Sequence, residues 1–312
     1  MLLADLLLYA LSFIAIWLGA GLIISASSKF SKKLKLSAFA FSFVFLGILT
    51  STPEFSVGLQ AIADRDAGIF VGNLLGGIVV IFLVIIPILA VFGKGISLKH
   101  ELSNRMLLLA MGVIVLPSFL TLDRRITNFE GAVMVVAYFG LLYLVQRKNG
   151  IFDKENKQLL NIKAYSYRDF FSLLLGIGLV FVSSILIVDK TLYFADLLKI
   201  SAFYISLLII ALGTNLPELA LAIRSVISGK REIAMGDYIG SAAANTLMFG
   251  IFTLLNDGEV LTISNFPITF MFITVSLVAF YLLSRLKNYI SRKQGFLLLG
   301  VYVLFLVFEL MR

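Results

Sequence analysis

Two acidic residues, Glu54 and Glu218, lie within long apolar stretches of the chain. The mostly apolar residues 37–53 precede Glu54, which places its carboxylate near the middle of a predicted membrane-spanning helix. A carboxylate at that depth is costly and usually marks an ion pathway or a proton relay. No Lys or Arg lies in the central part of any predicted span, so a structural ion pair is disfavoured. We therefore predict that a cation from solution pairs with these carboxylates.

Polar residues accompany both acids at helical spacing. Thr50 and Ser51 precede Glu54 by four and three residues, so these side chains share one helix face. Thr214 and Asn215 repeat this arrangement before the second acid. The two helices would therefore offer hydroxyl and amide groups together with the carboxylates.

Each acid also directly follows a proline, Pro53 or Pro217. Proline lacks an N–H group and clashes with the carbonyl group four residues earlier, which breaks the helix. We expect freed carbonyl oxygens at residues 49–50 and 213–214. Broken membrane helices line cavities, and their carbonyl groups coordinate ions.

The expected cation ligands are all oxygen atoms. The chain has no Cys, and its single histidine, His100, lies in a predicted charged loop. Calcium takes about six to eight oxygen ligands, whereas magnesium requires tighter octahedral geometry and resists dehydration. Two glutamates balance a divalent charge, so we predict calcium, with sodium as an alternative occupant of hydroxyl and carbonyl positions.

The composition indicates which elements position these residues. Of 312 residues, 60% are hydrophobic and only 14% are charged, whereas a soluble domain has about 25% charged residues. This excludes a soluble enzyme, a disordered chain and a nucleic-acid-binding protein. A spanning helix needs about 20 apolar residues, so we predict an all-α, multi-pass cell-membrane protein in the lipid bilayer, with ten transmembrane helices. The predicted spans are 5–26, 37–62, 69–92, 105–121, 127–146, 169–188, 200–226, 233–255, 266–285 and 294–311.

Basic residues are distributed unevenly between the predicted loops. The odd-numbered loops hold 20 of the 26 Lys and Arg residues, and the opposite side holds 6. Because short cytoplasmic loops are enriched in Lys and Arg, we predict that both termini lie outside. The connection 147–168 then becomes a cytoplasmic linker between two five-helix halves, 1–146 and 169–312.

The two halves share motifs at a constant offset. Residues Thr50–Glu54 read TSTPE and Thr214–Glu218 read TNLPE; Gly72–Gly77 read GNLLGG and Gly236–Ser241 read GDYIGS. Each pair is separated by 164 positions. Corresponding helices are five spans apart and would cross the bilayer in opposite directions. This is the inverted-repeat plan of secondary transporters, whose binding site lies between the repeats near the midplane.

The glycines of the second motif have a structural interpretation, since Gly72/Gly76 and Gly236/Gly240 form small-xxx-small pairs that permit close helix packing. The polar residues in these spans need partners. They include Asn73 and a stripe with a spacing of four, formed by Asp237, Ser241 and Asn245.

With these motifs, the sequence resembles the cation/calcium exchanger superfamily, and the prokaryotic sodium/calcium exchangers in particular. The family hallmark is a repeated Gly-Thr-Ser-Leu-Pro-Glu followed by Gly-Asn-x-x-Gly-Ser. The resemblance covers both repeats and the ten-helix plan. It implies a secondary antiporter that exports calcium against sodium entry by alternating access.

The resemblance also implies roles for individual residues. Glu54 and Glu218 would be the central calcium ligands, and Thr50 and Thr214 would add carbonyl oxygens. Flanking sodium sites would be lined by Ser51, Asn215, the carbonyl groups of Gly47 and Ala211, and the Ser241 hydroxyl. The family usually adds polar groups at the positions of Gly77, Ile81 and Asn245.

The chain departs from the family pattern at several positions. The departures are Leu49 and Thr52 in the first motif, Asn215 in place of serine, Gly77 in place of serine, Ile81 in place of a polar residue and Asp237 in place of asparagine. They lead to the hypothesis that fewer sodium ions bind, or that protons replace them.

Three alternatives remain open. The first is a proton/calcium antiporter of the same fold, with Glu54, Glu218 or Asp237 carrying the proton. The second is a membrane-embedded enzyme, which would need a nucleophile and base or a metal cluster that this sequence does not offer, so a non-enzyme is favoured. The third is a passive channel, which would not require two proline-broken repeats. No cofactor is expected beyond the transported ions, and neither a nucleic acid nor an obligate protein partner is implied.

Overall fold

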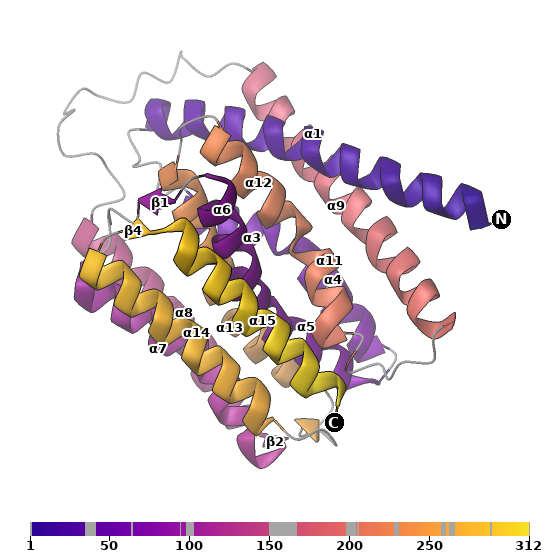
Figure 1. The fold of residues 1–312 in the computed structure, drawn as a ribbon, viewed down its shortest axis with the longest axis vertical. Helices are drawn as coiled ribbons and strands as arrows, with labels where there is room; N and C mark the ends of the chain where they lie inside the picture. Colours follow the sequence, from indigo (N-terminus) through magenta and orange to yellow (C-terminus); the bar gives the residue numbers. More distant parts are fainter. Residues whose placement is uncertain are drawn as a thin grey trace.

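The protein is built almost entirely from helices, packed as a bundle (Figure 1). The computed structural model describes residues 2–34, 42–63, 65–93, 95–97, 103–149, 167–197, 204, 206–227, 231–256, 260–261, 266–287 and 289–311. The helices and helical turns are α1 (Leu2–Leu34), η1 (Ser42–Leu46), α3 (Gly47–Thr50), α4 (Thr52–Ala63), α5 (Ala67–Val80), η2 (Ile81–Ile85), α6 (Ile86–Phe92), α7 (Asn104–Leu120), η3 (Thr121–Asp123), α8 (Asn128–Asn149), α9 (Tyr167–Leu197), η5 (Ser206–Ile210), α11 (Ala211–Thr214), α12 (Leu216–Ile227), α13 (Arg231–Leu255), α14 (Pro267–Lys287) and α15 (Arg292–Leu310).

Two short antiparallel strand pairs connect loops of the bundle. Strand β1 (Ile96–Ser97) pairs with β4 (Tyr289–Ile290), and β2 (Arg125–Ile126) pairs with β3 (Val260–Leu261). The pairs connect loops that are distant in the sequence. Strand β1 follows α6 and β4 precedes α15, whereas β2 precedes α8 and β3 follows α13.

Six described helical runs are long and apolar enough to cross a membrane, and each of two bent helix pairs adds one if it counts as a single span. The six are Ala67–Phe92, Asn104–Asp123, Asn128–Val145, Met235–Leu255, Pro267–Arg285 and Arg292–Leu310. Six of the ten predicted spans therefore have a counterpart of sufficient length and apolarity, and two more do if each bent pair is one span. The other two predicted spans, 5–26 and 169–188, fall within the longer helices α1 and α9.

Several sequence predictions fall outside the described residues. These are the loop histidine His100, most of the predicted linker (150–166), and the first residues of the second and seventh predicted spans (37–41, 200–203 and 205).

The centre of the bundle consists of α5, η2 and α6, which form one continuous and almost entirely buried helical run. It is apolar on all sides, as expected of a helix surrounded by other helices. Helix α13 is also largely buried, whereas only 28% of the residues in the apolar spans of α8 and α15 are buried. The two most buried helices are therefore the ones that carry Asn73 and the polar stripe of the second motif.

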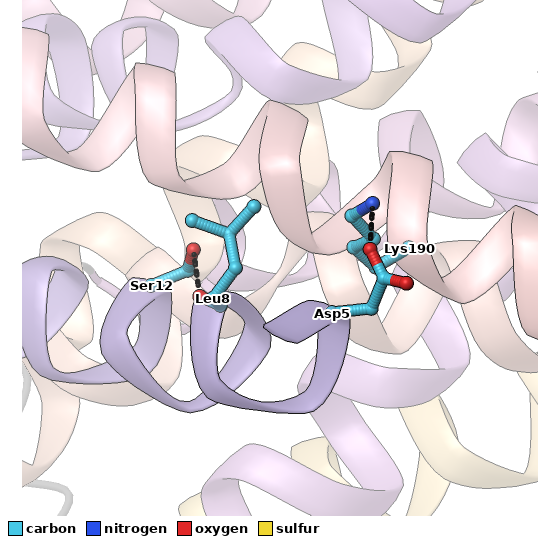
Figure 2. Close-up of polar contacts among 4 residues, drawn as sticks. All are labelled: Asp5, Leu8, Ser12 and Lys190. Atoms are coloured by element: carbon cyan, nitrogen blue, oxygen red, sulfur yellow. Dashed lines mark hydrogen bonds and ion pairs between the residues drawn. The ribbon is translucent and has the colours of Figure 1, made fainter. Parts of the chain in front are cut away.

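Helices α1 and α9 pack mainly against each other and lie along one flank of the bundle, opposite α7, α8 and α14 (Figure 1). An ion pair joins them, with 2.6 Å between Lys190 Nζ and Asp5 Oδ1 (Figure 2). About two turns further along α1, the Ser12 hydroxyl donates to the Leu8 carbonyl oxygen (Figure 2). Helix α1 also contacts α12, where the Arg224 guanidinium lies 4.6 Å from the centre of the Trp17 ring.

Both motif helices are broken where the sequence predicts. The η1–α3 segment and α4 meet at Ser51 with a bend of 45°, and the η5–α11 segment and α12 meet at Asn215 with a bend of 46°. In each case the proline occupies the second residue of the following helix, Pro53 in α4 and Pro217 in α12. In the first turn of a helix the backbone N–H has no helical partner, so proline, which lacks it, is tolerated there. The proline cannot continue the preceding helix.

Two of the four carbonyl groups predicted to be free, those of Leu49 and Gly213, have local partners. The Leu49 carbonyl oxygen accepts a hydrogen bond from the Thr52 hydroxyl, and the Gly213 carbonyl oxygen accepts one from the Asn215 N–H group. Both are therefore occupied locally. The carbonyl groups that polar side chains contact lie one turn earlier, at Gly47 and Ala211.

Two helix crossings bring the halves into close contact, and the glycines of the second motif permit them. A methyl group added at Gly240 would lie 2.4 Å from the Phe43 carbonyl oxygen, and one at Gly76 would lie 2.2 Å from the Leu207 carbonyl oxygen. Leu207 follows Phe43 by 164 residues, and Gly240 follows Gly76 by the same number. The same crossing therefore occurs twice, with the two halves exchanged. The close-packing interpretation therefore holds for Gly240 and Gly76.

We expect Gly240→Ala to destabilise the protein, because backbone rather than a flexible side chain occupies the space for the new methyl group. Overpacking of this kind costs about 1–3 kcal/mol, so the midpoint of thermal unfolding in detergent should fall. Gly112→Ala is the matched control, since nothing lies within 4 Å of its methyl position. Equal midpoints for the two variants would contradict the close crossing.

Candidate functional site

All eleven predicted site residues are buried and lie on three adjoining parts of the bundle. Glu54 and Glu218, exposed by 1% and 0%, lie in the first turns of α4 and α12. The residues before the helix breaks are Gly47, Thr50 and Ser51 in the first half and Ala211, Thr214 and Asn215 in the second. Helix α13 contributes Asp237, Ser241 and Asn245.

The Thr50 hydroxyl is the centre of one group of contacts. Its oxygen lies 2.9 Å from the Leu46 carbonyl oxygen, 3.1 Å from Asp237 Oδ1 and 3.0 Å from Ser241 Oγ. A threonine hydroxyl has a single proton, so it cannot donate to the carbonyl oxygen and to the carboxylate at the same time. A proton or a cation at Asp237 would satisfy the remaining acceptor.

Thr214 takes the equivalent position in the other half. Its hydroxyl donates to Asn73 Oδ1 over 3.1 Å, and Asn73 is the counterpart of Asp237 at the offset of 164 residues. The two threonines thus make the same contact with the central helix of the opposite half. They differ in one respect, because the partner is neutral in α5 and acidic in α13.

Ser241 connects the two broken helices. Its hydroxyl lies 3.2 Å from Glu218 Oε1 and 3.4 Å from the Gly47 carbonyl oxygen. Together with its contact to Thr50, this places one α13 side chain against both halves. Two residues of the polar stripe, Asp237 and Ser241, therefore have partners on the broken helices, at Thr50 and Glu218.

The three acids retain unsatisfied acceptor oxygens. Glu54 Oε2, Glu218 Oε2 and Asp237 Oδ2 are buried without a hydrogen-bond partner, and Asp237 is near enough to repel both glutamates. A buried anion without a partner costs several kcal/mol. The arrangement therefore requires positive charge, supplied by cations or protons.

Within the described part of the chain, His, Cys, Asp and Glu form no tight group of three or more that could hold a metal ion on its own. A cation here would draw the rest of its ligands from hydroxyl, amide and main-chain carbonyl oxygens. Such mixed oxygen sets are typical of calcium.

The two flanks of the site differ. On the first, the Ser51 hydroxyl donates to the Gly47 carbonyl oxygen over 2.7 Å. On the second, Asn215 Nδ2 donates to the Ala211 carbonyl oxygen over 2.8 Å. A cavity of about 280 Å³ adjoins the first flank and is lined by Ser51 and Thr52 together with apolar residues of α3, α4 and α13.

Sequence reasoning left one residue out of the site. Asn73 was recognised only as a polar residue that needs a partner, yet it contacts Thr214 and its Nδ2 atom has no hydrogen-bond partner. The signal was available, because the repeat offset relates Asn73 to Asp237, which was included. Ile81, the counterpart of Asn245, is buried at the start of η2 and contributes no polar atom.

Comparisons with known proteins show which family the chain matches. Residues 5–146 and 169–311 match the family described as sodium/calcium exchanger protein. The chain is 28% identical over 270 residues to the inner membrane protein YrbG of Escherichia coli, covering 84% of this chain and 83% of that protein. It is 24% identical to the sodium/calcium exchanger MaX1 of Methanosarcina acetivorans, covering 98% and 99%.

Among solved structures, the fold is similar to that of the sodium-calcium exchanger NCX_Mj soaked with sodium and strontium. The TM-score is 0.81 at 21% identity, covering 97% of this chain and 98% of the other. The family match extends over both halves of a multi-pass helical membrane protein whose motif residues meet at one buried site, and on these grounds the chain belongs to the sodium/calcium exchanger protein family.

Proposed function

We propose that this protein exchanges calcium for sodium by alternating access and that Glu54 and Glu218 are the central calcium ligands. One observation carries the proposal. Two buried carboxylates, each on a broken helix, have a free oxygen and form no ion pair with a described Lys or Arg. The printed name of the relative MaX1, sodium/calcium exchanger, supports the same pair of ions.

The chemistry of the surrounding groups favours calcium over a monovalent ion at the centre. Two glutamates neutralise a 2+ charge, and hydroxyl and main-chain oxygens complete a flexible ligand set. The Gly47 carbonyl oxygen and the Ser51 and Ser241 hydroxyls suit a monovalent ion beside it. We assign sodium to this flank.

A proton is the second candidate for the coupling ion, and Asp237 is the observation that favours it. Its carboxylate is fully buried and faces the Thr50 hydroxyl, whose single proton cannot serve both the Leu46 carbonyl oxygen and Asp237. The equivalent position in the first half holds the neutral Asn73. Protonation of Asp237 would remove a negative charge from the site without any change of side chain.

We further propose that α1 and α9 complete ten spans arranged as two inverted five-helix repeats. The repeats are 1–146 and 169–312, joined by the cytoplasmic linker 147–168, with both termini outside. The exchanged crossings at Gly240 and Gly76 support the repeat, and the excess of basic residues in the odd-numbered loops supports the orientation. The exchanger needs no resident cofactor and no protein partner in this scheme.

Single cysteines would test the orientation, because the natural chain has none. In intact cells, an impermeant maleimide should label Asp123→Cys from outside, since residue 123 is exposed in a predicted external loop. Tyr167→Cys, at a position that is 93% exposed within the predicted linker, should react only after the membrane is permeabilised. The opposite pattern would invert the proposed topology.

We expect Glu54→Gln or Glu218→Gln to abolish calcium uptake into proteoliposomes. Loss of one partner in a buried charge pair costs about 3 kcal/mol or more, so calcium binding should weaken by about 100-fold. Each variant should unfold no earlier than the wild type without calcium, because an uncompensated buried anion has been removed.

Glu130→Gln is the matched control for this experiment, since Glu130 caps α8 at Thr127 outside the buried site. It should transport normally. Uptake close to that of the wild type by either site variant would refute the assignment of the calcium ligands.

Calcium uptake with sodium and pH gradients imposed separately distinguishes the coupling ions. If protons compete at Asp237, wild-type uptake should fall as the pH falls, because the protonated side chain no longer attracts a cation. Asp237→Asn should flatten this pH dependence while the sodium gradient still drives uptake. Asp123→Asn is the matched control.

Two results would contradict these assignments. An unchanged pH profile in Asp237→Asn would exclude Asp237 as the proton site. Wild-type uptake that is indifferent to sodium would exclude sodium as the coupling ion.

A further inference from the structure

The two flanks of the site present opposite chemistry to a cation. On the first flank, hydroxyl groups of Ser51 and Ser241 surround the Gly47 carbonyl oxygen. Hydroxyl oxygens have lone pairs and can rotate their proton away, so they can coordinate a cation. On the second flank, the equivalent carbonyl group at Ala211 faces the NH₂ end of Asn215, which has no lone pair to offer.

Hydrogen bonds fix the orientation of both amides on the second flank. Asn215 Nδ2 lies 2.8 Å from the Ala211 carbonyl oxygen, and Asn245 Nδ2 lies 3.3 Å from the Leu74 carbonyl oxygen. A carbonyl oxygen only accepts hydrogen bonds, so it pairs with the NH₂ end of an amide rather than with its oxygen. In both asparagines, the amide nitrogen rather than the amide oxygen must therefore face the carbonyl group.

Gly77 matches this arrangement. It is the counterpart of Ser241, but a methyl group added there would lie 2.9 Å from Asn245 Nδ2 and 3.1 Å from Asn215 Nδ2. The two amide nitrogens thus lie where a side chain of residue 77 would begin. The departures at residues 77 and 215 are a matched pair, since the larger asparagine occupies space that the glycine leaves open.

We propose that the amide groups of Asn215 and Asn245 take the place of a monovalent cation on the Ala211 flank, which leaves the Gly47 flank as the one monovalent site beside calcium. An amide NH₂ group carries partial positive charge and donates to the carbonyl oxygen that a cation would otherwise contact. It also prevents a second hydroxyl ligand at position 77. This inference rests on the proposed exchange function and specifies its coupling.

A hollow adjoins the first flank. The cavity of about 280 Å³ is lined by Ser51 and Thr52 at the first helix break. Ile48 and Phe55, which line the same cavity, are 45% and 38% exposed. The first flank, with its two hydroxyl ligands, therefore adjoins a mostly apolar hollow that reaches the protein surface.

The test is a count of the sodium ions that displace one calcium ion. Radioactive calcium binding to the purified protein is measured over a range of sodium concentrations. The slope of log apparent Kd against log sodium concentration gives that number by linkage. In Asn215→Ser combined with Gly77→Ser, we expect the slope to rise by about one, so that a tenfold increase in sodium weakens calcium binding about tenfold more than in the wild type.

The mirror variant, Ser51→Asn combined with Ser241→Gly, is the matched control. It places the same amide and glycine on the first flank, and the sodium dependence of calcium binding should fall toward zero. Gly77→Ser alone should lower the thermal unfolding midpoint, because both amide nitrogens remain in place, and its combination with Asn215→Ser should recover part of the loss, since only Asn245 then contacts residue 77. The difference between these two unfolding midpoints tests the packing of residues 77 and 215 even if a variant transports poorly.

Calcium–calcium exchange without sodium separates the two levels of the proposal. If wild-type protein fails to exchange calcium for calcium, the proposed function itself fails and the inference fails with it. If calcium exchange occurs but the wild type and the variant that combines Gly77→Ser with Asn215→Ser have equal slopes, the amide substitution is refuted while the exchange function stands. A wild-type slope of zero would also overturn the inference, because no monovalent site would remain.

Discussion

The fold is organised around a concentration of negative charge that the protein itself does not neutralise. Glu54, Glu218 and Asp237 are buried among apolar helices, and each has an oxygen without a hydrogen-bond partner. Burying such anions costs several kcal/mol per ion in real proteins. The structure tolerates this cost because mobile cations or protons can supply the missing charge, and a site of this kind is stable only while something occupies it.

Two helix crossings make this concentration of charge possible. The backbone of η1 reaches Gly240 and the backbone of η5 reaches Gly76, at distances that leave no room for a side chain. Close approach brings hydroxyl groups on the broken helices to the central helices, as in the contacts of Thr50 with Asp237 and of Thr214 with Asn73. The same architecture is used twice with different residues, so the symmetry lies in the backbone and the specificity in the side chains.

Much of this architecture follows from the sequence because its causes are local. The breaks near residues 51 and 215 follow from Pro53 and Pro217, and the central run follows from its apolar residues at 67–92. The extra length of α1 was missed, since its polar end, 27–34, continues the helix beyond the apolar segment. The fit between Gly77 and Asn215 could not be predicted, because it depends on neighbours 138 positions apart in the sequence.

The amide that donates to the Ala211 carbonyl oxygen is part of the chain, whereas an ion in that place would enter and leave in every cycle. Each ion that moves down a tenfold gradient releases about 1.4 kcal/mol, and a net charge that crosses 100 mV adds about 2.3 kcal/mol. A side chain does not cross the membrane, so it releases neither the free energy of a concentration gradient nor that of the membrane potential. Replacing a travelling ion with a fixed amide lowers the steepest calcium gradient that the exchanger can sustain. In return, an exchanger with the proposed amide would consume fewer driving ions for each calcium ion that it moves.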